Sequence, residues 1–160
     1  MSITKNQIRR MFESQGADHV KLVIADDSLV KSRLLPREES AALTIDQTIN
    51  FVIGAASPAP ERAAVFVRER ASLTSLEDAG LTLRGYLTDC ITNVQPFAKI
   101  NFFSDLEHVS VEAFDDDVIE FGEDFQNGGF SRRVVIAGGL IGAITARIHN
   151  EIQSGWVEPA

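Results

Sequence analysis

A segment that is both strongly acidic and rich in phenylalanine constrains this chain most. Between Ile100 and Ser131 there is no Lys or Arg but there are nine acidic residues, so this segment carries −9 while the whole chain nets −8. Seven of the ten phenylalanines fall in nearly the same stretch. Disordered acidic tails are poor in aromatic residues. We therefore expect this segment to be folded and to present a negatively charged surface that binds a partner. Its acidic residues are Asp105, Glu107, Glu112, Asp115, Asp116, Asp117, Glu120, Glu123 and Asp124.

Length and composition predict one soluble globular domain over residues 1–160, because a chain of this size can bury a core unaided. A pI near 4.8 argues against direct nucleic-acid binding, which needs a basic surface. The single cysteine, Cys90, cannot form an internal disulfide, which favours the cytoplasm or the inside of a virus-like or secretion assembly. The longest apolar run, from Val134 to Ile144, has eleven residues and is too short to span a bilayer.

Capping residues followed by apolar periodicity predict helices in the first half of the chain. Thr4 is a candidate N-cap for a helix that ends at Gly16, and Thr44 with Gln47 forms a capping box for a helix to about Ala56. A further helix is predicted over 63–73, while 19–25 fits either a strand or a helix.

The second half of the chain is predicted to contain two longer helices around an ambiguous region. Thr74 and Glu77 form a capping box that opens a helix over 75–91, and the last helix is predicted over 132–153. Within 97–126, KINFF and HVSVEAF alternate like strands, whereas DDDVIEFGEDF is typical of a short helix. The predicted fold is mainly α, a compact helical domain with a small β element, and an α+β fold is the alternative.

The apolar run VVIAGGLIGAITA at 134–146 has two interpretations. As strand, turn and helix it is similar to a dinucleotide-binding fingerprint, but the first glycine position holds Ala137. As a buried helix it carries a ridge of small residues, Gly138, Gly142 and Ala146, that lets another backbone approach closely. We favour the second interpretation, in which this helix packs within the fold or between subunits.

The sequence VKLVIADDSLVKSRLL at 20–35 resembles the first strand and helix of response-regulator receiver domains. Asp26 and Asp27 stand where that family has its metal-binding acidic pair. The alternative, which we favour, is that these two residues form a turn or an N-cap.

A second resemblance is to the apoptosis-regulating Bcl-2 family. The stretch SLEDAGLTLRGY at 75–86 resembles its short helix-in-groove motif through Leu76, Ala79 and Gly80, and Arg133 matches an arginine that precedes the family's central helix. The Asn-Trp pair of that family is missing here. This resemblance implies an apoptosis regulator.

No cofactor or metal is predicted. Asp105, His108 and Glu112 would share one face of a helix, but this is one imperfect copy of a motif that metal-binding bundles use twice.

The favoured function is therefore a non-enzymatic protein–protein interaction or assembly protein. It would be an oligomeric subunit of a larger particle, or an inhibitor or chaperone of a basic partner, acting through the acidic, Phe-rich surface. The alternatives are a DNA-mimicking inhibitor, a Bcl-2-like regulator and an enzyme of unknown type.

Overall fold

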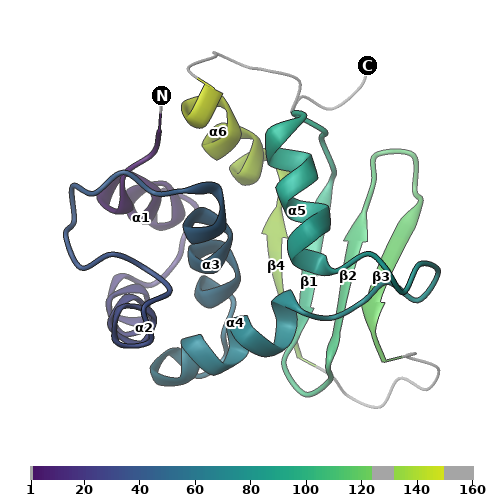
Figure 1. The fold of residues 1–160 in the computed structure, drawn as a ribbon, viewed down its shortest axis with the longest axis horizontal. Coiled ribbons are helices and arrows are strands. Elements are labelled where there is room, and N and C mark those ends of the chain that lie inside the picture. Colours follow the sequence, from purple (N-terminus) through teal and green to yellow (C-terminus); the bar gives the residue numbers. More distant parts are fainter. Residues whose placement is uncertain (1, 124–131, 150–160) are drawn as a thin grey trace.

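The structure of the protein, a computed structural model, describes residues 2–123 and 132–149 (Figure 1). Within these ranges the chain forms six α-helices and a four-stranded antiparallel sheet, which is an α+β fold. The prediction of a mainly α fold is therefore wrong, because four segments between Lys99 and Ala137 pair as strands. None of the helices in the described ranges is long and apolar enough to cross a membrane.

The first half of the chain is helical. Both predicted N-caps are confirmed, because the Thr4 hydroxyl accepts from the Gln7 amide and the Thr44 hydroxyl accepts from the Gln47 amide. Gly16 follows the first helix with a φ of +98°, a conformation that suits glycine. The elements are α1 (Lys5–Ser14), α2 (His19–Lys31), α3 (Ile45–Ala55), a 3-10 turn (Pro60–Arg62) and α4 (Ala63–Ala71).

Residues 19–25, which fit either a strand or a helix by sequence, belong to α2, with Asp18 as its N-cap. Asp26 and Asp27 lie inside this helix, so the expected turn or N-cap at these residues is wrong. The strand that the receiver resemblance implies is not formed there.

The helix predicted over 75–91 begins eight residues later than expected. It is α5 (Leu83–Thr92), and its N-cap is Thr82, whose hydroxyl accepts from the Gly85 amide. Ser75 forms an isolated bridge with Phe121 of the sheet, so the chain before Thr82 follows the sheet edge. The stretch that resembles the Bcl-2 helix-in-groove motif is consequently not a helix over its first half.

The sheet contains β1 (Lys99–Phe103), β2 (His108–Glu112), β3 (Val118–Gly122) and β4 (Arg133–Ala137), in the order β3-β2-β1-β4. Two predictions are corrected here. The short helix expected at DDDVIEFGEDF is β3, and the helix expected over 132–153 is a strand, β4, followed by α6 (Gly138–His149). The predicted end of that helix lies outside the described residues.

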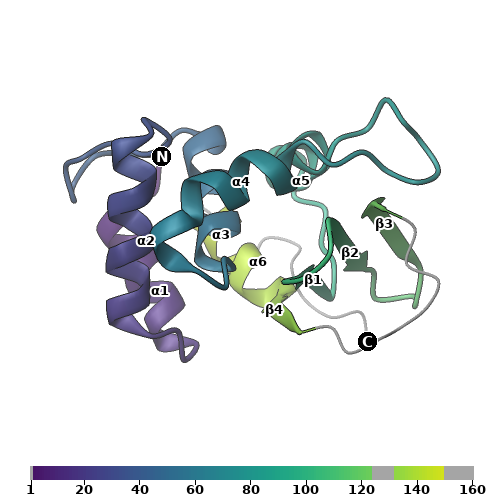
Figure 2. The same ribbon diagram turned by 90° about the horizontal axis from the view of Figure 1, so that it is seen from below.

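The register of the sheet separates an apolar face from a mixed one. Phe102 pairs with Val109 and Val134, and Val109 pairs with Phe121, so all four side chains lie on the same face. Figure 2 shows α4 and α5 over this side of the sheet. The buried residues of this face and the helices form one continuous core, in which the Arg70 guanidinium of α4 lies 4.6 Å from the Phe66 ring and donates to the Phe103 carbonyl of β1.

The glycine pair that opens α6 gives a test of the β1–β4 junction. A Cβ on Gly138 would lie 1.7 Å from the Phe97 carbonyl oxygen, whereas a Cβ on Gly139 would meet nothing within 4 Å. Gly138→Ala should therefore lower the free energy of unfolding by about 3 kcal/mol, the upper end for overpacking. Gly139→Ala should leave it unchanged or raise it by up to about 1 kcal/mol. Urea unfolding measures both, and equal effects of the two substitutions would contradict this packing.

Candidate functional site

The structure places the predicted acidic site along one hairpin, β2–β3, and its two ends. Asp105 and Glu107 lie in the turn before β2, and Glu123 follows β3 beside them, since its amide donates to the Glu107 carbonyl. The triplet 115–117 lies in the turn at the other end of the hairpin. These residues are exposed, and Asp124 lies outside the described residues.

Two further acidic residues lie between these ends on the face opposite the helices. Glu112 is half-buried, 3.6 Å from the Lys99 ammonium, and accepts from the Asn101 amide group at 2.7 Å. Glu120 is exposed and lies 3.6 Å from His108 Nε2. The acidic residues therefore line a hairpin whose five-residue strands are roughly 15 Å long, and they do not converge on one point.

Most of the described phenylalanines of this segment lie away from the acidic surface. Phe97, Phe102 and Phe121 are fully buried in the core, and Phe103 and Phe114 are half-buried. Phe103 lies on the same face of the sheet as Glu112, with its ring 5.4 Å from the His108 ring, and Phe114 adjoins the acidic turn at 115–117. The described phenylalanines therefore contribute mainly to the core, and two of them border the acidic surface.

The candidate metal face is not formed. Asp105 lies in a turn, while His108 and Glu112 stand at opposite ends of β2. The Nδ1 atom of His108 lies 2.6 Å from the Glu123 carbonyl oxygen. Among residues 2–123 and 132–149, no three His, Cys, Asp or Glu side chains gather closely enough to hold a metal ion.

The small residues predicted to form a packing ridge lie on α6. Gly138 is buried against the backbone of Phe97, and its amide donates to the Ala98 carbonyl at 2.8 Å. Gly142 is buried and Ala146 is half-buried. The helix packs against α5, α1 and the strands β1 and β4.

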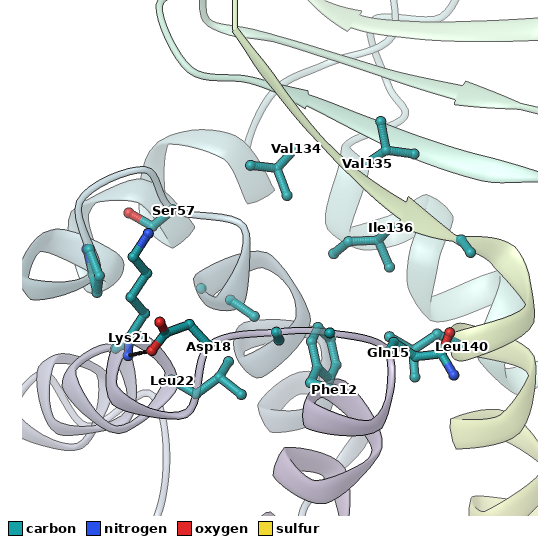
Figure 3. A pocket seen from close by; sticks show the side chains of 17 residues that line it. Phe12, Gln15, Asp18, Lys21, Leu22, Ser57, Val134, Val135, Ile136 and Leu140 are labelled. Atoms are coloured by element: carbon teal, nitrogen blue, oxygen red, sulfur yellow. Dashed lines mark hydrogen bonds between the residues drawn. The ribbon is translucent and has the colours of Figure 1, made fainter.

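A groove that the sequence did not indicate lies between β4 and the helices (Figure 3). Its volume is about 340 Å³. Apolar side chains supply most of its walls, and exposed polar side chains, among them Gln15, Asp18 and Lys21, form its rim. The walls come from the turn between α1 and α2, the face of α2, the end of α3, and β4 with the start of α6; among them are Phe12, Leu22, Ala25, Ala55, Ile136 and Leu140.

Figure 3 shows Ile136 pointing from β4 toward Phe12 and Leu22 on the opposite wall, while Val135 points to the other side of the strand. The Lys21 side chain extends toward Ser57 at the rim. Asp18 is already engaged, because its carboxylate accepts from the Lys21 backbone amide as the N-cap of α2. No motif identified this groove, since its lining comes from segments that are far apart in the sequence.

A buried ion pair joins α1 to α2. Lys5 is 1% exposed, and its ammonium lies 3.0 Å from Asp26 Oδ1 while it donates to the carbonyls of Pro36 and Arg37. Burial raises the pKa of Asp26, although the hydrogen bond from Lys5 opposes this shift. Two of the ammonium hydrogens bond to these carbonyls and the ammonium pairs with the Asp26 carboxylate, so this cluster ties elements together and offers no open site.

The cysteine is also structural in character. Cys90 is buried in α5, and burial raises the pKa of its thiol to about 11. Burial likewise raises the pKa of the neighbouring Tyr86 phenol. A thiol held in its protonated form is a poor nucleophile.

Comparison with known proteins gives no further guide: no protein-family model, curated protein or solved structure matches this chain.

The buried Lys5–Asp26 pair predicts that removing Lys5 destabilises the fold. Lys5→Met should lower the free energy of unfolding by about 3 kcal/mol at pH 7, because it removes the closer of the two cations beside the buried Asp26 carboxylate and leaves only Arg9, whose guanidinium lies 3.7 Å from Oδ2. The matched control is Lys31→Met, which removes an exposed pair with Asp27 and should cost at most about 1 kcal/mol.

The pH dependence of the Lys5→Met variant gives a second readout. Because the folded-state pKa of Asp26 is raised above its unfolded value of 3.8, its contribution to stability is lost as the pH rises through the folded pKa. Removing Lys5 strengthens this effect, so the deficit of the variant should shrink as the pH is lowered toward the unfolded pKa. Urea unfolding at several pH values measures this, and a deficit that stays constant with pH would contradict the assignment.

Proposed function

We propose that this protein is a non-enzymatic protein-binding domain that takes up an apolar segment of a partner in the groove between β4 and the helices. The observation that carries the proposal is the groove itself, which has apolar walls and a solvent-exposed polar rim. Its volume lies at the lower end of the range for specific binding pockets. Such a site accommodates one or two large apolar anchors, the kind of contact that dominates protein interfaces.

A protein partner, and not a small metabolite, is supported by exposed apolar surface on α2, the helix that forms one wall of the groove. Helix α2 supplies Leu22 and Ala25 to the groove wall, and its other side leaves Val20, Val23 and Ile24 exposed, Val20 by 64%. Clustered exposed apolar side chains are typical of interaction surfaces. A ligand confined to the groove would leave this surface unused, whereas a larger partner could cover both.

The non-enzymatic part of the proposal rests on the chemistry of the groove. Its titratable side chains are Asp18 and Lys21, and Asp18 is engaged as a helix cap. The groove contains no histidine or cysteine among its described lining residues. The single cysteine, which cannot form an internal disulfide, supports a reducing, cytoplasmic location.

The acidic hairpin is a second candidate surface, for a partner with a basic face. Six exposed carboxylates lie at its two ends, and none of them forms an ion pair with a Lys or Arg of the described residues. One-signed surfaces accelerate association with oppositely charged partners and discriminate between partners.

Filling the groove should abolish binding. Ala17 is half-buried in the lining, and Ala17→Phe projects a ring into the space that a ligand side chain needs. Ala79→Phe, at an exposed position outside the groove, is the matched control. Panning a random peptide library on the parent protein should enrich peptides that bind the parent and Ala79→Phe but not Ala17→Phe. No enrichment, or equal binding to both variants, would reject the groove as the binding site.

The hairpin surface makes a separate prediction about salt. Asp105, Asp117 and Glu123 are exposed and can be changed together to Lys without touching the Asx turn in which the Asp115 carboxylate accepts from the Asp117 amide. Association with a basic protein such as a histone should slow as ionic strength rises beyond the physiological range, where the screening length is about 8 Å. The triple variant should bind slowly at every salt concentration and melt near the parent temperature. Stopped-flow rates that do not change with salt would reject this surface.

A further inference from the structure

The free edge of the sheet forms one wall of the groove. Strand β4 lies at the end of the strand order, paired only with β1. The groove lining includes all four residues from Val134 to Ala137, although the Val135 side chain points to the other side of the strand. The backbone edge of β4 therefore faces the groove, with Val135 46% exposed.

The hydrogen-bond pattern shows which backbone groups of β4 are free. The Gly138 amide donates to the Ala98 carbonyl, and the Ser104 amide donates to the Arg132 carbonyl. In an antiparallel ladder every second residue bonds to the neighbour strand, so the even-numbered residues of β4 bond to β1. The peptide groups of Arg133 and Val135, and the amide of Ala137, point away from β1 toward the groove.

The opposite edge of the sheet is occupied. On β3 the outward-pointing groups are the Glu120 carbonyl and the Gly122 amide, which bond to the backbone of Leu76 and Thr74 respectively. Among the described residues, no backbone group bonds in this way to the outward groups of β4. An edge strand with free backbone groups is a template for another strand.

We propose that the groove binds an extended segment of a partner protein by β-strand addition, antiparallel to β4. This inference rests on the proposed function and names the binding mode and the ligand. Main-chain hydrogen bonds to Val135 would supply affinity, and the groove would select side chains at alternate positions. Residues of the added strand opposite Val134 and Ile136 point into the groove, because side chains of paired residues share a face.

Charge defines the end of the ligand. Three basic side chains are exposed and form no ion pair with a described residue: Lys21 at the rim of the groove, and Arg132 and Arg133 at the start of β4. The Arg133 side chain shares a face with the residue opposite it on an added strand, where an acidic side chain is favoured. The expected ligand motif has four residues. From N- to C-terminus they are an apolar residue opposite Ile136, any residue opposite Val135, an apolar residue opposite Val134 and an acidic residue opposite Arg133.

A single extended chain fits this site better than a second copy of the protein. The wall opposite β4 is formed by the α1–α2 turn, α2 and the end of α3, so the free edge faces other elements of the same chain across a narrow groove. A strand that belongs to another sheet would bring its neighbouring strands and helices into that wall.

N-methylated peptides test the binding mode directly. The probe is the fluorescein-labelled peptide GSVTVESG, with its threonine opposite Val135 and its glutamate opposite Arg133. Methylating the threonine amide removes a hydrogen bond to β4 and should weaken binding at least about tenfold. Methylating the second valine amide, which points away from β4, is the matched control and should change affinity less than about twofold. Fluorescence anisotropy measures affinity, and bound peptide should slow hydrogen exchange of the Val135 amide.

Variants of the protein provide the reciprocal test. Val135→Pro removes the outward amide without removing a bond to β1, whereas Val135→Thr keeps it, so only the proline variant should lose binding. If Val135→Pro fails to fold, the peptide pair decides alone. Arg133→Glu should weaken binding about two- to fivefold, and a peptide with lysine in place of its glutamate should restore it.

The outcomes separate this inference from the proposed function. If peptides bind the parent but not Ala17→Phe, and methylation of either amide has the same effect, the groove is a binding site and strand addition is rejected. Library peptides with apolar residues at helical i, i+3 and i+4 spacing would likewise reject it. If no peptide depends on the groove, both proposals fail. A parent protein that is dimeric by light scattering and becomes monomeric with Val135→Pro would instead assign the edge to a second copy.

Discussion

The antiparallel pairing of β4 with β1 is the contact on which the rest of the structure depends. It brings Arg133–Ala137 beside Lys99–Phe103, and the chain turns directly from the strand into α6 at Gly138, where the carbonyls of Phe97 and Ala98 leave no room for a side chain. This close approach fixes where α6 begins and how it crosses the sheet. It also makes β4 the outermost strand, next to the N-terminal helices (Figure 1), and so creates both the groove and its free edge.

The two edges of the sheet differ in chemistry as well as in hydrogen bonding. The β3 edge is covered by residues 74–76 and belongs to the acidic hairpin, while the β4 edge is open and begins with two arginines. This difference in charge between the two edges follows from the sequence, in which the acidic segment ends just before Arg132. A partner with an acidic extended segment would be attracted to one edge and repelled by the other, which favours a single orientation.

The buried polar groups serve the scaffold. Lys5 holds α1 to Asp26 of α2 by an ion pair, and it holds α1 to the loop after α2 by hydrogen bonds to the Pro36 and Arg37 carbonyls. Buried pairs of this kind contribute little net stability but are costly to break. They fix how the helices stand relative to one another, and the wall opposite β4 depends on that arrangement. The groove is thus a property of the whole helical layer and not of any single motif.

The sequence by itself determined the elements whose signals are local. The N-cap at Thr4 and the capping box at Thr44 place the starts of α1 and α3, because the side-chain and backbone groups involved lie within one turn. The acidic character of the hairpin was also readable, since exposed charge needs no partner. The groove was not, because its walls meet only in the folded chain.

Tertiary structure decided the rest. Val134, Val135 and Ile136 suit either a buried helix or a strand by apolarity, and only pairing with β1 selects the strand, for which β-branched residues are favoured. The capping pattern at Thr74 was overridden in the same way, since Ser75 is drawn into a bridge with Phe121 and the helix starts at Leu83. Hydrogen bonds to a distant strand satisfy the backbone as well as a helix does, so a local pattern cannot choose between them.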